Sequence, residues 1–131
     1  LKAFYVDVAA ELEKVGNLQY APRFETQEEY WRFIGAADIA FSCSYHETFG
    51  IALLEQAYAH TACVAPQRVV YPEVHAGALL VPPAEIEAGI ERLLNSPLRW
   101  HRAIVSSRAN AARYDVATTI EQLLGILSNL E

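Results

Sequence analysis

Hydrophobic positions along the chain follow two patterns, one with helical spacing and one of short apolar runs. Helical spacing opens the chain, and Gly16-Asn17 ends it; its apolar positions are Leu1, Phe4, Tyr5, Val8, Leu12 and Val15. Short apolar runs bounded by turn residues follow at 18–21, 38–43, 62–66 and 78–81. Because helical segments separate these runs, the pattern predicts an α/β fold with a Rossmann-like, doubly wound parallel sheet of about four strands.

Local signals place the helices between and after these strands. Thr26 followed by Glu29 is a capping box, which predicts a helix to about residue 37. Asp115 is expected to cap a last helix to about Leu127. The other helices are expected over 53–60 and 73–76, from Pro83 to the Ser96-Pro97 stop, and over 100–114. The chain therefore ends in helices after its last strand.

The run from Ser44 to Tyr58 carries the candidate chemistry. It predicts a strand end, a tight turn and a helix, with Glu47 at the mouth of the turn and Glu55 about one helical turn inside. Between residues 51 and 59 only Glu55 and Gln56 are polar. A carboxylate set into so apolar a helix costs several kcal/mol unless it is paired. We therefore expect a ligand at Glu55.

The start of this helix predicts which ligand. If the helix begins near Phe49 or Gly50, the amides of residues 48–51 have no internal acceptor and carry the positive end of the helix dipole, which favours phosphate. Glu55 would lie about 7 Å along the axis from Gly50, the reach from a diphosphate to a ribose. Glu47, on the other side of the phosphate, would accept hydrogen bonds from sugar hydroxyls. Two carboxylates around a diphosphate indicate a nucleotide-sugar.

The Glu-x7-Glu spacing, with Phe49-Gly50 between the two acids, resembles the C-terminal donor-binding domain of retaining glycosyltransferases of the GT-B fold, family 4. The Pro72-Glu73 turn and the run 77–82 agree with that family, and the resemblance covers nearly the whole chain. The stretch 67–73, Gln-Arg-Val-Val-Tyr-Pro-Glu, replaces the family's Gly-Gly-x-Pro-Glu loop. It is similar to the variant of the tRNA-queuosine mannosyltransferase subgroup, as are 17–20 and 28–30.

The chain also departs from this family. The Gly-Arg pair and the Lys that neutralise the departing diphosphate are absent, as is the acceptor-binding N-terminal domain. Residues 1–131 are therefore expected to form a partial donor domain without its first strands, inactive by itself. His60-Thr61 stands where the family has a small Gly, which puts the tightness of that turn in question.

The resemblance implies a set of site residues. Glu47 is expected to be catalytic, and the donor is expected to be bound by Glu55, Thr48, Phe49, Gly50, Ile51, His46, Tyr20, Arg68 and Glu73. Purely structural roles remain possible for several of these residues. Glu47 alone would suit a helix N-terminus, His46 a surface loop and Tyr20 a packed core. Glu73 is equally suited to capping a short helix, and Arg68 to pairing with Glu73 or standing by the donor phosphates.

The implied reaction is glycosyl transfer with retention, from GDP-mannose or a UDP-sugar to an acceptor, which in the subgroup is queuosine in tRNA. The chain contains no Asp-x-Asp. His60, His75 and His101 lack ligand-like spacing, so neither a metal nor a cofactor is expected. The departing diphosphate would instead be stabilised by amides and by the helix dipole.

Composition narrows the cellular setting. The 131 residues are 53% hydrophobic and 20% charged with a net charge of −6, which indicates one soluble globular domain. The negative charge argues against a dominant nucleic-acid footprint, so a tRNA acceptor would be held mainly by the missing domain. Four arginines over 99–113 are interpreted as a solvated helix face with i,i+4 pairs.

No run approaches the roughly 20 apolar residues of a membrane span, and a cytoplasmic location is expected. Cys43 and Cys63 are expected to be free thiols. Self-association through exposed sheet edges of the fragment is a further expectation.

Two other classes remain open at this point. Parallel sheets with loops at their strand ends also serve as non-catalytic nucleotide-binding or scaffold domains, and a sugar epimerase shares the fold. Nucleotide binding separates the scaffold from the enzyme, since a scaffold would bind neither GDP nor UDP at millimolar concentration.

Overall fold

The computed structural model describes residues 14, 16 and 23–128, and for residues 123, 126 and 127 it describes the backbone alone. The helix expected over residues 1–15, the strand expected over 18–21, and Tyr20 lie outside the described residues. The chain divides into two compact units, residues 1–30 and 31–131. Each unit is described by itself.

The described end of the first unit contains the predicted capping box. The Glu29 amide donates to Thr26 Oγ1 over 3.2 Å, and the Thr26 amide donates back to Glu29 Oε2 over 3.3 Å. These bonds open helix α2, Gln27–Gly35. The predicted helix start is confirmed, and the helix ends about two residues before the predicted limit.

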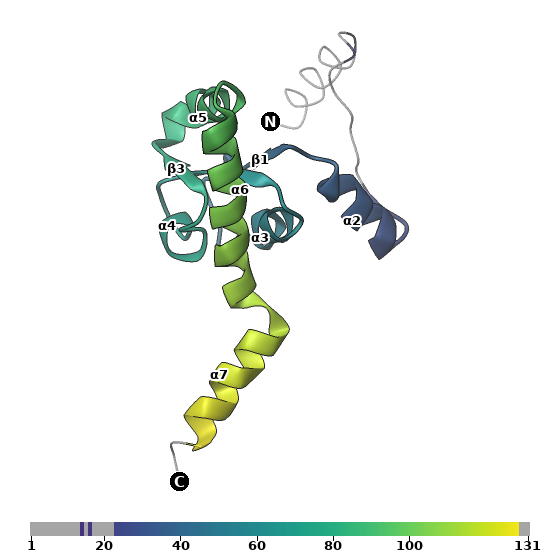
Figure 1. Ribbon diagram of the computed structural model, residues 1–131, viewed down its shortest axis with the longest axis vertical. Coiled ribbons are helices and arrows are strands. Elements are labelled where there is room, and N and C mark those ends of the chain that lie inside the picture. Colours follow the sequence, from purple (N-terminus) through teal and green to yellow (C-terminus); the bar gives the residue numbers. More distant parts are fainter. Residues whose placement is uncertain (1–13, 15, 17–22, 129–131) are drawn as a thin grey trace. The chain divides into compact units, whose positions relative to one another are not determined.

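The second unit alternates strands and helices as predicted (Figure 1). Its elements after α2 are β1 (Ile39–Phe41), α3 (Ile51–Tyr58), β2 (Ala62–Pro66), α4 (Tyr71–Val74), β3 (Leu79–Val81), the 3-10 turn η1 (Pro83–Glu85), α5 (Ile86–Leu94), α6 (Pro97–Ala111), the 3-10 turn η2 (Ala112–Tyr114) and α7 (Val116–Ser128).

Within the described residues the strands form one parallel sheet in the order β1-β2-β3. Ile39 pairs with Ala62, and Val64 pairs with Leu79. Every residue of β2 is buried, as an apolar central parallel strand requires. The prediction that residues 38–43 form a buried strand is wrong in part. Strand β1 is shorter, and Phe41 is 55% exposed, because β1 pairs along one side only in the described sheet.

Helices cover both faces of this sheet, which confirms the Rossmann-like architecture. Successive residues of β2 point to opposite faces, so Cys63 packs in one hydrophobic cluster with α3, while Val64 packs in another with α5. Helix α6 contributes Ala111 to the first cluster and Ala103 to the second. Figure 1 shows the strands between α3 and α5, with α6 running past both helices.

Polar side chains fix α6 across the sheet. Trp100 Nε1 donates to the carbonyl of Asp38 just before β1, Ser107 Oγ donates to the Gly77 carbonyl, and Asn110 Nδ2 donates to the Val74 carbonyl. The helix begins at Pro97, three residues earlier than predicted. The reason is local: Ser96 caps the amide of residue 99, and proline suits the first helical position.

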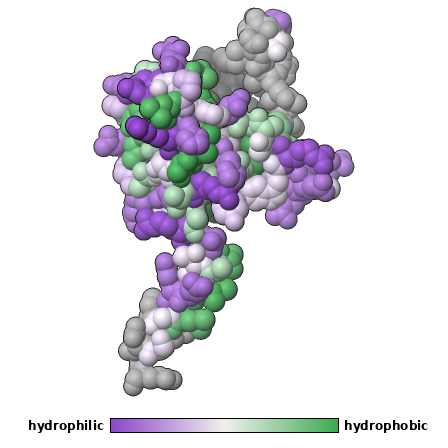
Figure 2. Space-filling view, in the orientation of Figure 1, coloured by the Kyte–Doolittle hydropathy of each residue, from purple (hydrophilic) through white to green (hydrophobic). Residues whose placement is uncertain are grey.

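Helix α7 begins where the sequence predicts. Asp115 Oδ1 accepts a hydrogen bond from the Thr118 amide over 2.8 Å, which is the expected N-cap bond. Val116, Ile120 and Leu124 recur every four residues and are 75%, 50% and 60% exposed, and Figure 2 shows hydrophobic surface along this helix. Among the described residues, no helix has the length and apolar character needed to span a bilayer.

Both cysteines are free thiols, as expected. Cys63 is buried in β2, and its thiol donates weakly to the Leu53 and Thr61 carbonyls. Burial raises the pKa of Cys63 to about 12. Cys43 is exposed after β1.

The turn after α3 is tight despite lacking glycine. Ala59 is the C-cap, and His60 adopts the left-handed conformation with φ of 67°. The His60 amide donates to the Ala57 carbonyl and the Thr61 amide donates to the Gln56 carbonyl, which together form a Schellman motif. His60 therefore occupies the position that glycine takes most readily.

Replacing His60 by glycine is expected to raise the free energy of unfolding by about 1 kcal/mol, because a left-handed residue with a Cβ carries a cost of about 1–2 kcal/mol. Urea unfolding measures this. The matched control is His101→Gly, the same change at an exposed position inside α6, which is expected to lower stability by about 1 kcal/mol. A destabilised His60→Gly variant would contradict the assigned turn.

Candidate functional site

The candidate site lies at the carboxyl ends of β1 and β2, where open parallel sheets bind ligands. Two loops meet there: 42–50, between β1 and α3, and 67–70, between β2 and α4. Glu47 and Gly50 come from the first loop and Arg68 from the second. The structure therefore brings these predicted residues to one edge of the sheet.

Gly50 sets the start of α3. It is the N-cap residue and adopts the left-handed conformation, with φ of 76° and ψ of 41°. Its carbonyl accepts hydrogen bonds from the amides of Leu53 and Leu54. Helix α3 begins at Ile51, so the turn and the helix start lie close to where the sequence predicts them.

The Glu47 carboxylate turns back onto its own loop. Its Oε1 atom accepts hydrogen bonds from the amides of Thr48 over 3.0 Å and Phe49 over 3.4 Å. Hydrogen bonds from the backbone of Phe49 and Gly50 hold the pKa of Glu47 below its ordinary value, so the group is ionised near neutral pH.

This contact changes the predicted anion site. The amides of Thr48 and Phe49, which the sequence assigns to phosphate, donate to Glu47 instead. Ile51 and Ala52 are the first residues of α3, and the first amides of a helix have no acceptor within the helix. The positive end of α3 therefore faces a resident carboxylate on one side and solvent on the other.

His75 supports this loop from beneath, and sequence reasoning missed it. The residue is 2% exposed at the end of α4, and its Nε2 atom lies 3.0 Å from the Phe49 carbonyl. Because a carbonyl only accepts, Nε2 must carry a hydrogen. A Cβ built on Gly50 would lie 2.6 Å from the same Nε2 atom. The His75 ring therefore packs directly against Gly50, where only glycine leaves room for it. No spacing in the sequence indicated this pair.

Burial lowers the pKa of His75, and the Phe49 carbonyl and the Glu47 carboxylate oppose that shift less strongly. The imidazole is therefore neutral near pH 7, with its hydrogen on Nε2. A neutral donor at this position orients the loop carbonyl without adding charge beneath the site.

Arg68 joins the two loops. Its guanidinium lies over the Tyr45 ring, 4.6 Å from the centroid, and Nη2 donates to the Tyr45 carbonyl over 3.2 Å. The alternative of an Arg68–Glu73 ion pair is wrong for the described residues. The following residue, Val69, adopts φ of 53°, a strained conformation for a β-branched side chain.

A second contact fixes the end of β1. The hydroxyls of Ser42 and Tyr71 lie 2.5 Å apart, and the Ser44 amide donates to Ser42 Oγ. Tyr71 is 1% exposed. The Tyr-Pro-Glu turn therefore holds the Glu47 loop through a buried phenol, a role that the sequence did not indicate.

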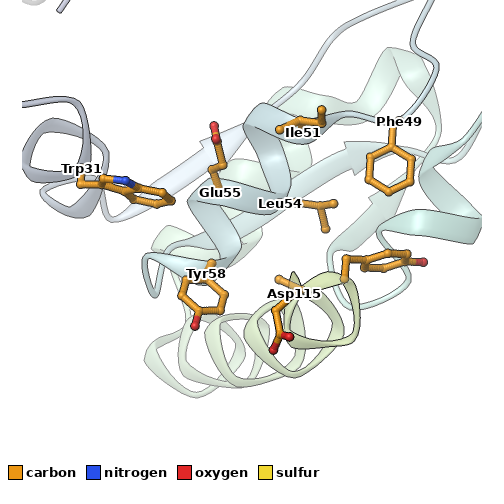
Figure 3. A pocket seen from close by; sticks show the side chains of 9 residues that line it. Trp31, Phe49, Ile51, Leu54, Glu55, Tyr58 and Asp115 are labelled. Carbon is orange, nitrogen blue, oxygen red and sulfur yellow. The ribbon is translucent and has the colours of Figure 1, made fainter. Parts of the chain in front are cut away.

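Glu55 lies on the rim of an apolar pocket of about 310 Å³. Figure 3 shows its carboxylate directed away from Leu54 and Asp115, on the side of Trp31 and Ile51. The premise that Glu55 is sunk in an apolar helix is wrong, because Leu53, Leu54 and Ala57 face the core while Glu55 is half-buried. The desolvation cost of the Glu55 carboxylate is therefore smaller than the sequence suggested, and a bound partner is needed less to offset it.

The pocket beside Glu55 has aromatic walls that the sequence did not group. Phe49 packs edge-to-face on Tyr114 with 5.6 Å between ring centroids, and Trp31 and Tyr58 complete the lining. Helix α2, the loop before α3, helix α3 and the η2 turn supply these four rings. They offer flat apolar surface beside a carboxylate.

The remaining predicted residues lie at the surface or outside the described part. His46, Thr48 and Glu73 are exposed, and Ile51 is 62% exposed. Glu73 lies in the first turn of α4 rather than at the cap of a helix over 73–76. Tyr20 is among the residues that are not described. Within the described ranges, no group of three or more His, Cys, Asp or Glu side chains is arranged to hold a metal ion.

Replacing Gly50 by alanine is expected to lower the free energy of unfolding by at least about 1–2 kcal/mol, the cost of a left-handed alanine. The clash with the buried His75 ring adds to this cost. Urea unfolding measures the change. Gly125→Ala in α7, where the added Cβ meets no atom within 4 Å, is the control and should be neutral or stabilising. Equal stability of the Gly50 variant and the parent would contradict the contact.

Acidification is expected to destabilise the protein as the pH falls below 6.5, because unfolded His75 then binds a proton that folded His75 resists. His75→Gln should remove this slope between pH 6.5 and 4.5, since Gln keeps a donor without titrating. The contribution of Glu47 is present above pH 4.5 and is lost only below it. Urea unfolding across pH 4.5–8 tests this, with exposed His101→Gln as control. An unchanged slope in His75→Gln would contradict the assignment.

Comparison with known proteins identifies the family. Residues 2–112 match the family model described as "Glycosyl transferases group 1". The chain is also 41% identical over 63 residues to the tRNA-queuosine alpha-mannosyltransferase of Drosophila melanogaster. That alignment covers 48% of this chain and 17% of the relative, so the chain matches a small part of that protein. The chain belongs to the group 1 glycosyltransferase family.

Proposed function

We propose that this chain forms part of the donor site of a retaining GT-B glycosyltransferase that uses a nucleotide-sugar. One observation carries the proposal: an ionised Glu47 and a rim carboxylate, Glu55, flank the left-handed Gly50 that opens α3. Family membership supports the reaction class, and the position of the two loops at the carboxyl ends of β1 and β2 supports the location.

The donor diphosphate is proposed to bind at the first free amides of α3, from Ile51 onward, where the helix dipole favours an anion. Glu55, about 6 Å further along the axis, would accept hydrogen bonds from the ribose hydroxyls. Tyr20 is proposed to lie by the base. His46, Thr48 and Glu73 are exposed around the loops and are proposed to contact the sugar and phosphates.

Glu47 is proposed to act on the sugar. Its carboxylate is held by loop amides, so the position of its charge is fixed. We propose that this charge would stabilise the positive charge that develops at the anomeric carbon. Negative charge on the departing diphosphate would be met by the α3 dipole and by Arg68, which lies in the adjoining loop. No metal is required by this arrangement. The family's Arg and Lys, expected upstream, would supply the remaining charge.

The donor and acceptor are proposed by similarity. Because the relative is named a tRNA-queuosine alpha-mannosyltransferase, we favour GDP-mannose as donor and queuosine in tRNA as acceptor, with action in the cytoplasm. The chain matches 17% of that relative, so we propose that the 131 residues bind donor and transfer nothing alone. Detectable sugar transfer by the isolated chain would contradict a partial site.

One observation favours a non-catalytic scaffold domain instead. Glu47 takes two of the amides that a diphosphate would use, and a bound anion must share the helix end with that charge. A scaffold would show no nucleotide binding, which the following measurement distinguishes.

Calorimetry with GDP, UDP and GDP-mannose is expected to detect binding at micromolar to millimolar concentration. Replacing Glu55 by glutamine should weaken it about 10-fold or more, because hydrogen bonds to a charged group are worth about 1.5–3 kcal/mol. Exposed Glu87→Gln in α5 is the charge-matched control. Absence of nucleotide binding at millimolar concentration would overturn the proposed function.

A further inference from the structure

We propose that the groove between α5 and α6 binds the phosphate backbone of a nucleic acid. The groove has a volume of about 340 Å³, and Arg92, Arg99 and Arg102 line it. Guanidinium groups present paired donors that match phosphate oxygens, so arginine is the side chain best suited to such a surface.

The groove is separate from the proposed donor site. Gly77, Ala78 and Leu79 line it where β3 begins. Because the strands are parallel, the start of β3 lies at the opposite edge of the sheet from the carboxyl end of β1, where the Glu47 loop follows. Trp100 Nε1 donates to the carbonyl of Asp38, just before β1. The start of α6 therefore lies at the amino ends of the strands, the edge at which β3 begins. The proposal therefore concerns a surface apart from the donor site, and the choice of a nucleic acid as ligand rests on the tRNA acceptor of the proposed function.

The groove has a rigid floor. A Cβ on Gly77 would lie 2.2 Å from the Ser106 carbonyl oxygen, so the loop packs directly on α6. Leu93 and Ala103, which are 2% and 9% exposed, fix the facing sides of α5 and α6. A ligand would find the arginines already spaced by packed helices.

The arginines differ in their partners. Arg92 is oriented by its own helix end, with Nε donating to the Ala88 carbonyl and Nη2 to Glu85 Oε2 over 3.0 Å. Arg99 and Arg102 are exposed and, within the described residues, have no hydrogen bond or ion pair through their side chains. Their charge is therefore available to a ligand.

The charge of α6 contrasts with that of the chain. Residues 97–114 contain four arginines and no Asp or Glu, although the whole chain carries a net charge of −6. The expectation that i,i+4 pairs compensate these arginines is wrong, since α6 holds no acid to pair with them. Arg108 turns instead toward the Tyr58 ring on the α3 side. Positive charge thus collects on the α5-facing side through Arg99 and Arg102.

A polymer of phosphates fits this surface better than one phosphate. Arg92 and Arg99 also line an adjoining hollow of about 490 Å³, together with Ser96 and Glu91. Cations spread over two connected hollows suit successive phosphates along a strand. Glu91 lines the second hollow, and its carboxylate would repel an anion there. The first hollow, between α5 and α6, is therefore the stronger anion-binding site.

The test is fluorescence anisotropy of a labelled single-stranded RNA of about 12 nucleotides titrated with the 131-residue chain, over a range of salt concentrations. Binding is expected near 10⁻⁴ M, with a slope of log K against log salt of about −2, which corresponds to about three phosphate contacts. Arg99→Gln/Arg102→Gln should weaken binding at least about 5-fold and reduce the slope to below about 1 in magnitude.

The matched control is Arg23→Gln/Arg113→Gln, which removes the same charge from exposed positions outside the groove. An equal loss of affinity in this control would overturn the proposal in favour of non-specific attraction. So would equally tight binding of polyglutamate, binding of inorganic phosphate without binding of RNA, or no binding at low salt. Donor calorimetry on the Arg99/Arg102 variant is expected to match the parent, so failure here is distinguishable from failure of the proposed function.

Discussion

The arrangement of the candidate site depends on one contact, the approach of the buried His75 ring to the loop at Phe49 and Gly50. The ring leaves no room for a Cβ on Gly50, and it donates to the carbonyl that precedes this residue. That contact fixes the left-handed turn, and the turn fixes the first amides of α3. The Glu47 carboxylate lies just before the turn, where the amides of Thr48 and Phe49 hold it. The position of Glu47 in its loop thus depends on the packing of the buried His75 ring against the backbone of that loop.

Helix α6 makes a comparable connection on a larger scale. Its N-terminal half is bonded to the residue before β1, and the turn after it brings Tyr114 against Phe49 beside α3. Both hydrophobic clusters include residues of α6. One helix therefore ties the opposite edges of the described sheet together, and it carries the arginine groove at one edge and a wall of the aromatic pocket at the other.

The parts that the sequence predicted are those with local causes. The Thr26–Glu29 box and the Asp115 cap involve residues three apart, and the apolar run of β2 reflects burial on both faces. The burial of Glu55 was predicted wrongly because the apolar character of the helix as a whole does not show which way each side chain points. Successive helix residues are rotated by about 100°, so Leu54 faces the core while Glu55 reaches the rim.

The parts that were missed join residues far apart in the chain. The contacts of His75 with Phe49, of Arg68 with Tyr45 and of Tyr71 with Ser42 each span more than 20 residues, and no local spacing signals such pairs.

The two cysteines give this architecture a practical consequence. The Cys63 thiol is enclosed in β2 with its pKa raised to about 12, so it stays protonated and shielded at neutral pH. Cys43 is exposed one residue after Ser42, which is bonded to Tyr71. A maleimide dye would therefore attach selectively at the base of the Glu47 loop, and its emission would report movements of that loop without any engineered residue.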